Sequence, residues 1–215
     1  MLLQYNSQIY NNNEIVTRDM DSMSEYLNFI YPLFKVTKDV TVLEVGPGPG
    51  WHTDMILSYQ PKELTCVEPD LDREVHLSDW FTTAKLVNAD IFDYLKDDIE
   101  PVDVVVACGV IYHFHSPFHF LETVVNKVNP KHLLLETIKA TDSMSIAIEN
   151  VNEQAQRIIK NNHKHVKLCL VAGTTYIIQA MTDMGYKLVE QKDYNESHRH
   201  KTNLCIMHFE RIDNE

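Results

Sequence analysis

Val40 to Gly50 reads Val-Thr-Val-Leu-Glu-Val-Gly-Pro-Gly-Pro-Gly, and this stretch decides the fold. Its first six residues are mostly apolar and β-branched, which predicts a buried strand. Three of the chain's six glycines, Gly46, Gly48 and Gly50, then fall within five residues, and a helical pattern begins at Trp51. Glycine permits a sharp turn and close approach of a ligand, because no Cβ is in the way. We therefore expect a strand, a ligand-binding glycine loop and a helix whose free N–H groups face the loop.

The spacing of the glycines limits the kinds of ligand that this loop could bind. A dinucleotide-binding G-x-G-x-x-G loop would need a glycine where Trp51 or Thr53 stands. No lysine follows, so the phosphate-binding P-loop is excluded as well. An acid, Glu44, lies two residues before G-x-G-x-G, and this arrangement resembles the nucleoside loop of class I S-adenosylmethionine-dependent methyltransferases. That cofactor has no phosphate, and an acid at the loop suits its sulfonium and ammonium groups.

Two further acids follow the next predicted strands. In nucleoside-binding βαβ units an acid at the end of the second strand accepts hydrogen bonds from the ribose hydroxyls. Glu68 is the first choice for this role and Asp70 the second, with a solvated carboxylate as the alternative. The resemblance implies that Asp90 accepts from the adenine amino group and that Ile91 lies against the ring. Taken alone, an aspartate in this position is a helix N-cap.

The fourth predicted strand, 102–108, leads into the second informative loop, 109–117. Parallel sheets bind ligands outside the carboxyl ends of their strands, so we place Cys108 and Gly109 among the cofactor-binding residues. The loop lacks the (Asp/Asn)-Pro-Pro-(Tyr/Phe) motif of DNA amino-methyltransferases. It also lacks the Pro-Cys pair of cytosine-C5 enzymes, so Cys108 receives no nucleophilic role.

The same loop resembles the Val-Leu-Tyr-His loop of the tRNA uridine carboxymethyltransferases, as does the segment 133–137. This local resemblance implies that Tyr112 and His113 lie near the reactive end of the cofactor. With His115 they are the candidate catalytic residues, as a proton acceptor or as groups that orient the methyl acceptor. His113, His115 and His119 have no acid or cysteine nearby to complete a metal site, so no metal is assigned.

The pattern of strands and helices along the chain predicts a three-layer α/β/α sandwich with a seven-stranded, mostly parallel Rossmann-like sheet. The last two strands, 187–191 and 204–209, have no helix between them and must pair antiparallel. Class I methyltransferases show the same antiparallel ending. We divide the chain into a lead-in and helix over 1–35 and a methyltransferase domain over 36–211. A helical insertion at about 142–165 is either a substrate lid or a homodimer contact.

The net charge, the cysteines and the lengths of apolar runs limit the partners and the cellular compartment that we expect. The formal net charge of −12 disfavours charge-driven binding to nucleic acid or to an anionic membrane. The four cysteines include no C-x-x-C pair, which favours reduced thiols in a cytoplasmic protein. No basic, apolar leader begins the chain, and no apolar run approaches the ~18 residues of a membrane span.

These observations together predict methyl transfer from S-adenosylmethionine, with S-adenosylhomocysteine as product and a small molecule as the favoured acceptor. Transfer to tRNA or protein remains open. Three alternatives also stay open: a tRNA wobble-uridine carboxymethyl- or methyltransferase, an enzyme that acts on S-adenosylmethionine itself, and a non-catalytic module that binds it.

Overall fold

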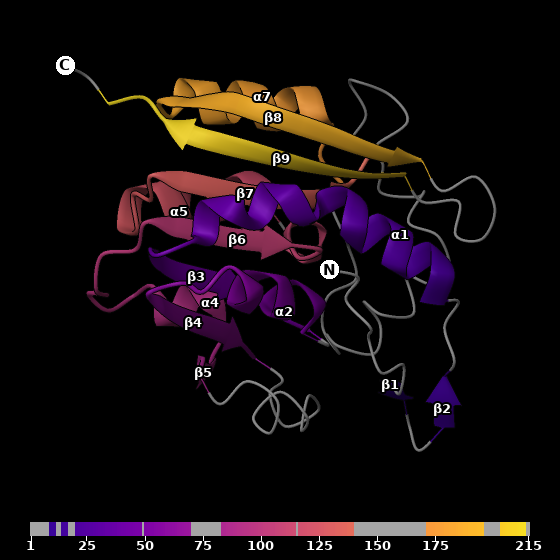
Figure 1. Ribbon diagram of the computed structural model, residues 1–215. Coiled ribbons are helices and arrows are strands. Elements are labelled where there is room, and N and C mark those ends of the chain that lie inside the picture. Colours follow the sequence, from indigo (N-terminus) through magenta and orange to yellow (C-terminus); the bar gives the residue numbers. More distant parts are fainter. Residues whose placement is uncertain are drawn as a thin grey trace.

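A twisted seven-stranded sheet forms the centre of the computed structural model (Figure 1). The structure describes residues 9–11, 14–16, 20–48, 50–69, 83–114, 116–139, 171–195 and 203–213. The strand order is β5-β4-β3-β6-β7-β9-β8. The strands are β3 (Thr41–Val45), β4 (Glu63–Glu68), β5 (Lys85–Asn88), β6 (Val104–Cys108), β7 (His132–Ile138), β8 (Tyr186–Asn195) and β9 (Asn203–Arg211).

The pairing within the sheet confirms the predicted topology. Strands β3, β4, β5, β6 and β7 pair in parallel, whereas β9 runs antiparallel to both β7 and β8. All five residues of β6 are buried, as expected for a central strand that is covered on both faces. The carboxyl ends of the parallel strands therefore meet at one edge of the sheet, where ligands of such folds bind.

Helices cover both faces of the sheet (Figure 1). One face packs against α1 (Met20–Ile30), the 3₁₀ helix η1 (Tyr31–Thr37) and α2 (Trp51–Ser58). The other face packs against α4 (Ile91–Tyr94), α5 (Pro117–Lys127) and α7 (Thr174–Asp183). A second 3₁₀ helix, η2 (Ile111–His113), follows β6. The result is the predicted three-layer α/β/α sandwich.

The structure differs from the sequence-based expectations at several points. The lead-in contains a short hairpin of β1 (Ile9–Asn11) and β2 (Glu14–Val16), which no pattern in the sequence predicted. The predicted helical insertion at about 142–165 lies outside the described residues. Cys66, Cys108 and Cys205 are free and buried, as expected, while Cys169 is outside the described part. No described helix is both long enough and apolar enough to cross a bilayer.

Tyr186 connects the edge strand β8 to the turn before β7 through a hydrogen bond. Its side chain is 1% exposed, and its hydroxyl donates a 2.7 Å hydrogen bond to the carbonyl of Pro130. Burial raises the pKa of this phenol to about 12, so the group stays a donor at all physiological pH values. We expect Tyr186→Phe to lower the free energy of unfolding by about 1–2 kcal/mol, because the buried carbonyl loses its partner. Urea unfolding measures this, with the exposed Tyr176→Phe as the control that should change little.

Candidate active site

The glycine loop adopts a backbone that only glycine takes easily. Gly46, Gly48 and Gly50 all have positive φ values, of 65°, 53° and 84°. A Cβ added to Gly46 would lie 2.3 Å from Cγ1 of Val110, whereas one added to Gly48 would meet no described atom within 4 Å. Gly46 therefore packs against the segment after β6, whereas the backbone at Gly48 has open space beside it.

Parallel pairing brings the predicted nucleoside-binding acids to neighbouring strand ends. Glu68 is the last residue of β4, and its Oε2 lies 4.0 Å from where a Cβ on Gly46 would stand. In the register of β4 with β5, Glu68 lies beside Asn88, two residues before Asp90. Two carboxylates therefore follow consecutive strands beside the glycine loop. The alternative acid, Asp70, lies outside the described residues.

Asp90 does act as a helix cap. Its side chain accepts a 2.8 Å hydrogen bond from the backbone N–H of Phe92 and so begins α4. Ile91 is 4% exposed and packs in the core beneath α4. A carboxylate has about four acceptor sites, so a cap leaves room for a second donor. The roles of Asp90 and Ile91 in adenine binding remain predictions.

Glu44 points into the protein interior. Its Oε2 accepts hydrogen bonds from Thr53 Oγ1 at 2.7 Å and from Cys66 Sγ at 3.4 Å. Burial raises the pKa of this carboxyl to about 7, although both hydrogen bonds act to lower it. Glu44 therefore ties β3 to the first turn of α2 and to β4. A direct contact between Glu44 and a cofactor stays a prediction.

The predicted catalytic residues lie on η2, just past the end of β6. The rings of Tyr112 and His113 contact each other, with centroids 4.6 Å apart. The hydroxyl of Tyr112 lies 3.5 Å from where a Cβ on Gly109 would stand. His115 lies outside the described residues, and the ring of His119 stacks on Phe92 at 5.2 Å. The structure thus places Tyr112 and His113 next to Gly109, and their catalytic role remains a prediction.

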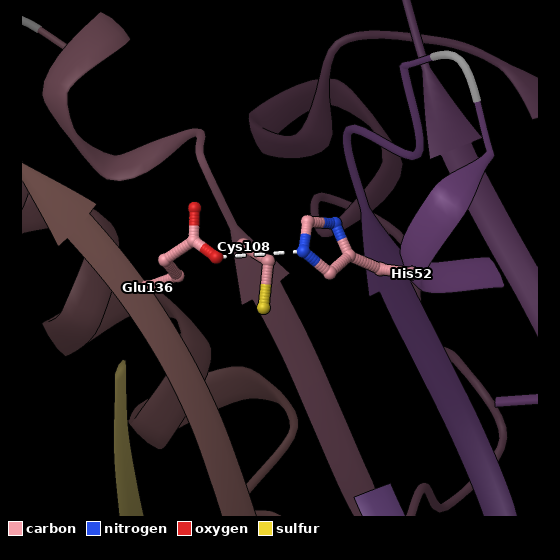
Figure 2. A group of neighbouring side chains, drawn as sticks. All are labelled: His52, Cys108 and Glu136. Carbon is pink, nitrogen blue, oxygen red and sulfur yellow. Dashed lines mark ion pairs between the residues drawn. The ribbon is translucent and has the colours of Figure 1, made fainter. Parts of the chain in front are cut away.

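A buried polar cluster that sequence reasoning missed lies on the α1–α2 side of the same edge (Figure 2). It joins His52 from α2, Cys108 from β6 and Glu136 from β7. The hydroxyl of Tyr26, on α1, donates a hydrogen bond to Oε2 of Glu136. The three members are 56 and 28 residues apart in the chain, so no local motif reveals them. The signal available in the sequence was that His52 lies two residues after the glycine loop. Cys108 is the last residue of β6, and Glu136 pairs with it on β7, two residues before that strand ends.

Burial keeps the members of this cluster neutral near pH 7. It raises the pKa of Glu136 to about 8 and lowers that of His52 to about 4. It also raises the pKa of the Cys108 thiol well above its ordinary value. The His52–Glu136 contact of 3.4 Å, drawn as an ion pair in Figure 2, therefore joins two uncharged groups at neutral pH.

Comparisons with known proteins assign the family. A family model described as a methyltransferase domain matches residues 16–191 of the 215. The tRNA U34 carboxymethyltransferase of Pasteurella multocida (strain Pm70) is 29% identical over 172 residues, which are 76% of this chain and 50% of that protein. This chain thus spans about half the length of that relative.

Solved structures with low sequence identity share the fold. The Burkholderia thailandensis 1,6-didemethyltoxoflavin-N1-methyltransferase, with S-adenosylhomocysteine bound, has a TM-score of 0.64 at 14% identity, covering 91% of this chain and 82% of that one. The N-methyltransferase NodS from Bradyrhizobium japonicum WM9, also with S-adenosylhomocysteine, has a TM-score of 0.62 at 17% identity, covering 88% and 87%. This chain therefore belongs to the methyltransferase-domain family and has the class I, S-adenosylmethionine-dependent methyltransferase fold.

Proposed function

We propose that this chain binds S-adenosylmethionine at the glycine loop and transfers its methyl group to a small-molecule acceptor. One observation carries the proposal: Gly46, Glu68 and Asp90 lie at or just past the carboxyl ends of three adjacent parallel strands, along one edge of the sheet. The site fits a cofactor without phosphate, because it offers an open backbone at Gly48 and carboxylate acceptors.

The residues of the chain would mainly bind the cofactor and orient the methyl acceptor. When bound, the cofactor supplies a methyl group that its sulfonium already activates. Aligning an acceptor with that methyl group can remove up to ~7–11 kcal/mol of barrier. Glu68 and Asp90 would hold the adenosine, with Glu44, Cys108 and Gly109 supporting the methionine end.

Tyr112, His113 and His115 are proposed on the acceptor side, to orient the acceptor or to take its proton. A positioned base would add about 10²- to 10⁴-fold, and only for an acceptor that loses a proton. The net charge of −12 supports a small molecule over bulk nucleic acid as the acceptor.

A second candidate is modification of a tRNA wobble uridine. It is favoured by the similarity to the tRNA U34 carboxymethyltransferase over 172 residues and by the Tyr112-His113 pair. Mass spectrometry of the copurified cofactor separates the candidates, because a carboxymethyl donor is heavier than S-adenosylmethionine. A labelled-methyl screen on small molecules, tRNA and protein then identifies the acceptor. Incubation with the cofactor alone detects breakdown, and binding without any turnover indicates a non-catalytic module.

Substitution of the two strand-end acids tests the site. We expect Glu68→Ala and Asp90→Ala each to weaken S-adenosylmethionine binding at least tenfold, or about 1.4 kcal/mol, because each removes a charged acceptor. Isothermal titration calorimetry with S-adenosylmethionine and S-adenosylhomocysteine measures the change. Glu63→Ala is the matched control, since this exposed acid begins β4 at the opposite end from Glu68. Equal affinity in Glu68→Ala, Asp90→Ala and the parent would show that the cofactor binds elsewhere.

A further inference from the structure

We propose that His52, Cys108 and Glu136 form a binding site for Zn²⁺ (Figure 2). This metal site is separate from the proposed methyl transfer. It also differs from the group of His113, His115 and His119, to which the sequence analysis assigned no metal. Its three side chains converge from α2, β6 and β7, and one ligand atom from each lies within 4.8 Å of the others. Thiolate, imidazole and carboxylate are the three ligand types that zinc takes in proteins.

The separation of His52 and Glu136 suits a shared metal ion better than a mutual hydrogen bond. Zinc lies ~2.0–2.2 Å from nitrogen and oxygen ligands, so two such ligands on a tetrahedral ion are about 3.4 Å apart. His52 Nε2 and Glu136 Oε2 are separated by 3.4 Å, which is longer than an ordinary hydrogen bond. The sulfur of Cys108 needs to approach the other two ligand atoms by no more than about 1.3 Å to reach its place on such an ion.

The Nε2 atom of His52 is buried, although the side chain as a whole is 14% exposed, and nothing in the described structure satisfies this nitrogen. It has no hydrogen-bond partner among the described residues, although it is aimed at the carboxylate of Glu136. A buried polar atom without a partner costs about 1–3 kcal/mol, so native proteins rarely keep one without a reason. A metal ion at the centre of the cluster would use the lone pair of this nitrogen.

Neighbouring groups hold the ligands in place as they do in metal sites. The hydroxyl of Tyr26 donates to the carboxylate of Glu136, and ligating carboxylates in proteins are usually hydrogen-bonded in this way. The ring of Phe34 stacks on His52, with a centroid distance of 5.9 Å and an interplanar angle of 12°. The two supports come from α1 and η1, so the N-terminal helices help to build the site.

The charges of the proposed site balance. Cys108 would bind as a thiolate after giving its proton to solvent, and Glu136 would bind as a carboxylate, which together offset the two charges of Zn²⁺. A neutral complex is compatible with burial and with a sulfonium bound nearby. The site lies beside Gly109, since Oε1 of Glu136 is 3.8 Å from where a Cβ on that glycine would stand. Three protein ligands leave a fourth position for water or for an oxygen or nitrogen of the acceptor.

Metal titration of the full chain tests the site. We expect the chelator-treated protein to bind one equivalent of Co²⁺, a coloured substitute for Zn²⁺, with tetrahedral visible bands and a thiolate-to-cobalt charge-transfer band. Cys108→Ser should abolish the charge-transfer band, and His52→Asn should weaken binding at least tenfold. Cys66→Ser is the matched control, because this thiol is also buried but contacts Glu44 instead, and it should keep both the band and the affinity. Circular dichroism establishes that each variant is folded.

Either of two results would overturn the zinc site. One is a parent protein that binds no cobalt at micromolar concentration or binds it without the thiolate band. The other is a folded Cys108→Ser or His52→Asn variant whose affinity stays within twofold of the parent. If Cys108→Ser does not fold, His52→Asn decides alone, because His52 lies in the first turn of α2 rather than in a central strand. None of these readouts requires methyl transfer, so they are independent of the proposed activity.

Discussion

Gly46→Ala is expected to lower the free energy of unfolding by about 2–5 kcal/mol, the largest effect of any single methyl group added to the loop. Two costs add. A left-handed backbone costs an alanine ~1–2 kcal/mol, and Gly46 has a φ of 65°. The new Cβ would also lie 2.3 Å from Cγ1 of Val110, an overlap that must be relieved by movement at a typical cost of ~1–3 kcal/mol. Urea unfolding of the parent and the variant measures the sum.

A double-mutant cycle separates these two costs. Val110→Ala removes the clashing methyl group and leaves its Cβ 3.5 Å away, which is ordinary contact. We therefore expect the second substitution to restore about 1–3 kcal/mol in the Gly46→Ala background, while it costs stability in the parent. Gly48→Ala is the matched control, since it adds the same methyl group at a φ of 53° with no described atom within 4 Å. Equal losses in Gly46→Ala and Gly48→Ala, or no rescue by Val110→Ala, would contradict the packing of the loop against the end of β6.

The fold could be predicted because its determinants are local. The apolar run that became β6 is typical of a strand covered on both faces, and all five residues are buried. The segment between the last two strands has no helical pattern, and this alone required β8 and β9 to pair antiparallel. The glycine loop could also be predicted from local sequence, because glycine is the residue that adopts positive φ values most easily, and its glycines have such values.

The chemistry of the site could be predicted only in part, because side-chain partners come from distant residues. The sequence offered two roles for Asp90, adenine binding and a helix N-cap, and the structure shows that its carboxylate caps α4. Glu44 is a predicted cofactor-binding residue, and that role stays a prediction, but the hydrogen bonds that its Oε2 accepts from Thr53 and Cys66 could not be read from the sequence. The cluster of His52 and Glu136 depends on which strands become neighbours, and no spacing within the sequence specifies that.

Two buried carboxyl groups lie on the α1–α2 side of the sheet beneath the predicted cofactor site. Glu44 is 2% exposed and Glu136 is 5% exposed, on strands separated only by β6. Desolvation dominates the pKa of both carboxyls, because the described residues offer neither of them a cationic partner that holds it ionised. The folded protein should therefore be less stable in alkaline solution than in mildly acidic solution as far as these groups are concerned.

Glu44→Gln is expected to remove roughly 2–3 kcal/mol of the stability that the parent loses between pH 5 and pH 8. The pKa of folded Glu44 is raised from its ordinary value of 4.5 to about 7, so the folded state holds the proton more tightly than the unfolded state. The stabilisation from this group is fully present below about pH 4.5 and is lost as the pH rises through about 7. Glutamine stays neutral and keeps an acceptor for the hydroxyl of Thr53, so its contribution does not change with pH.

Urea unfolding at pH 5, 6, 7 and 8, with a chelator present throughout, measures the difference between Glu44→Gln and the parent at each pH. The titrations of His52 and Glu136 are common to both proteins and cancel in that difference. Glu63→Gln is the matched control, because this acid is exposed at the start of β4, and its difference from the parent should stay within about 0.5 kcal/mol. If the difference for Glu44→Gln is equally flat, water must reach this carboxyl in solution. The interior beneath the glycine loop would then be wet, and a ligand on the loop would meet an ionised acid at neutral pH.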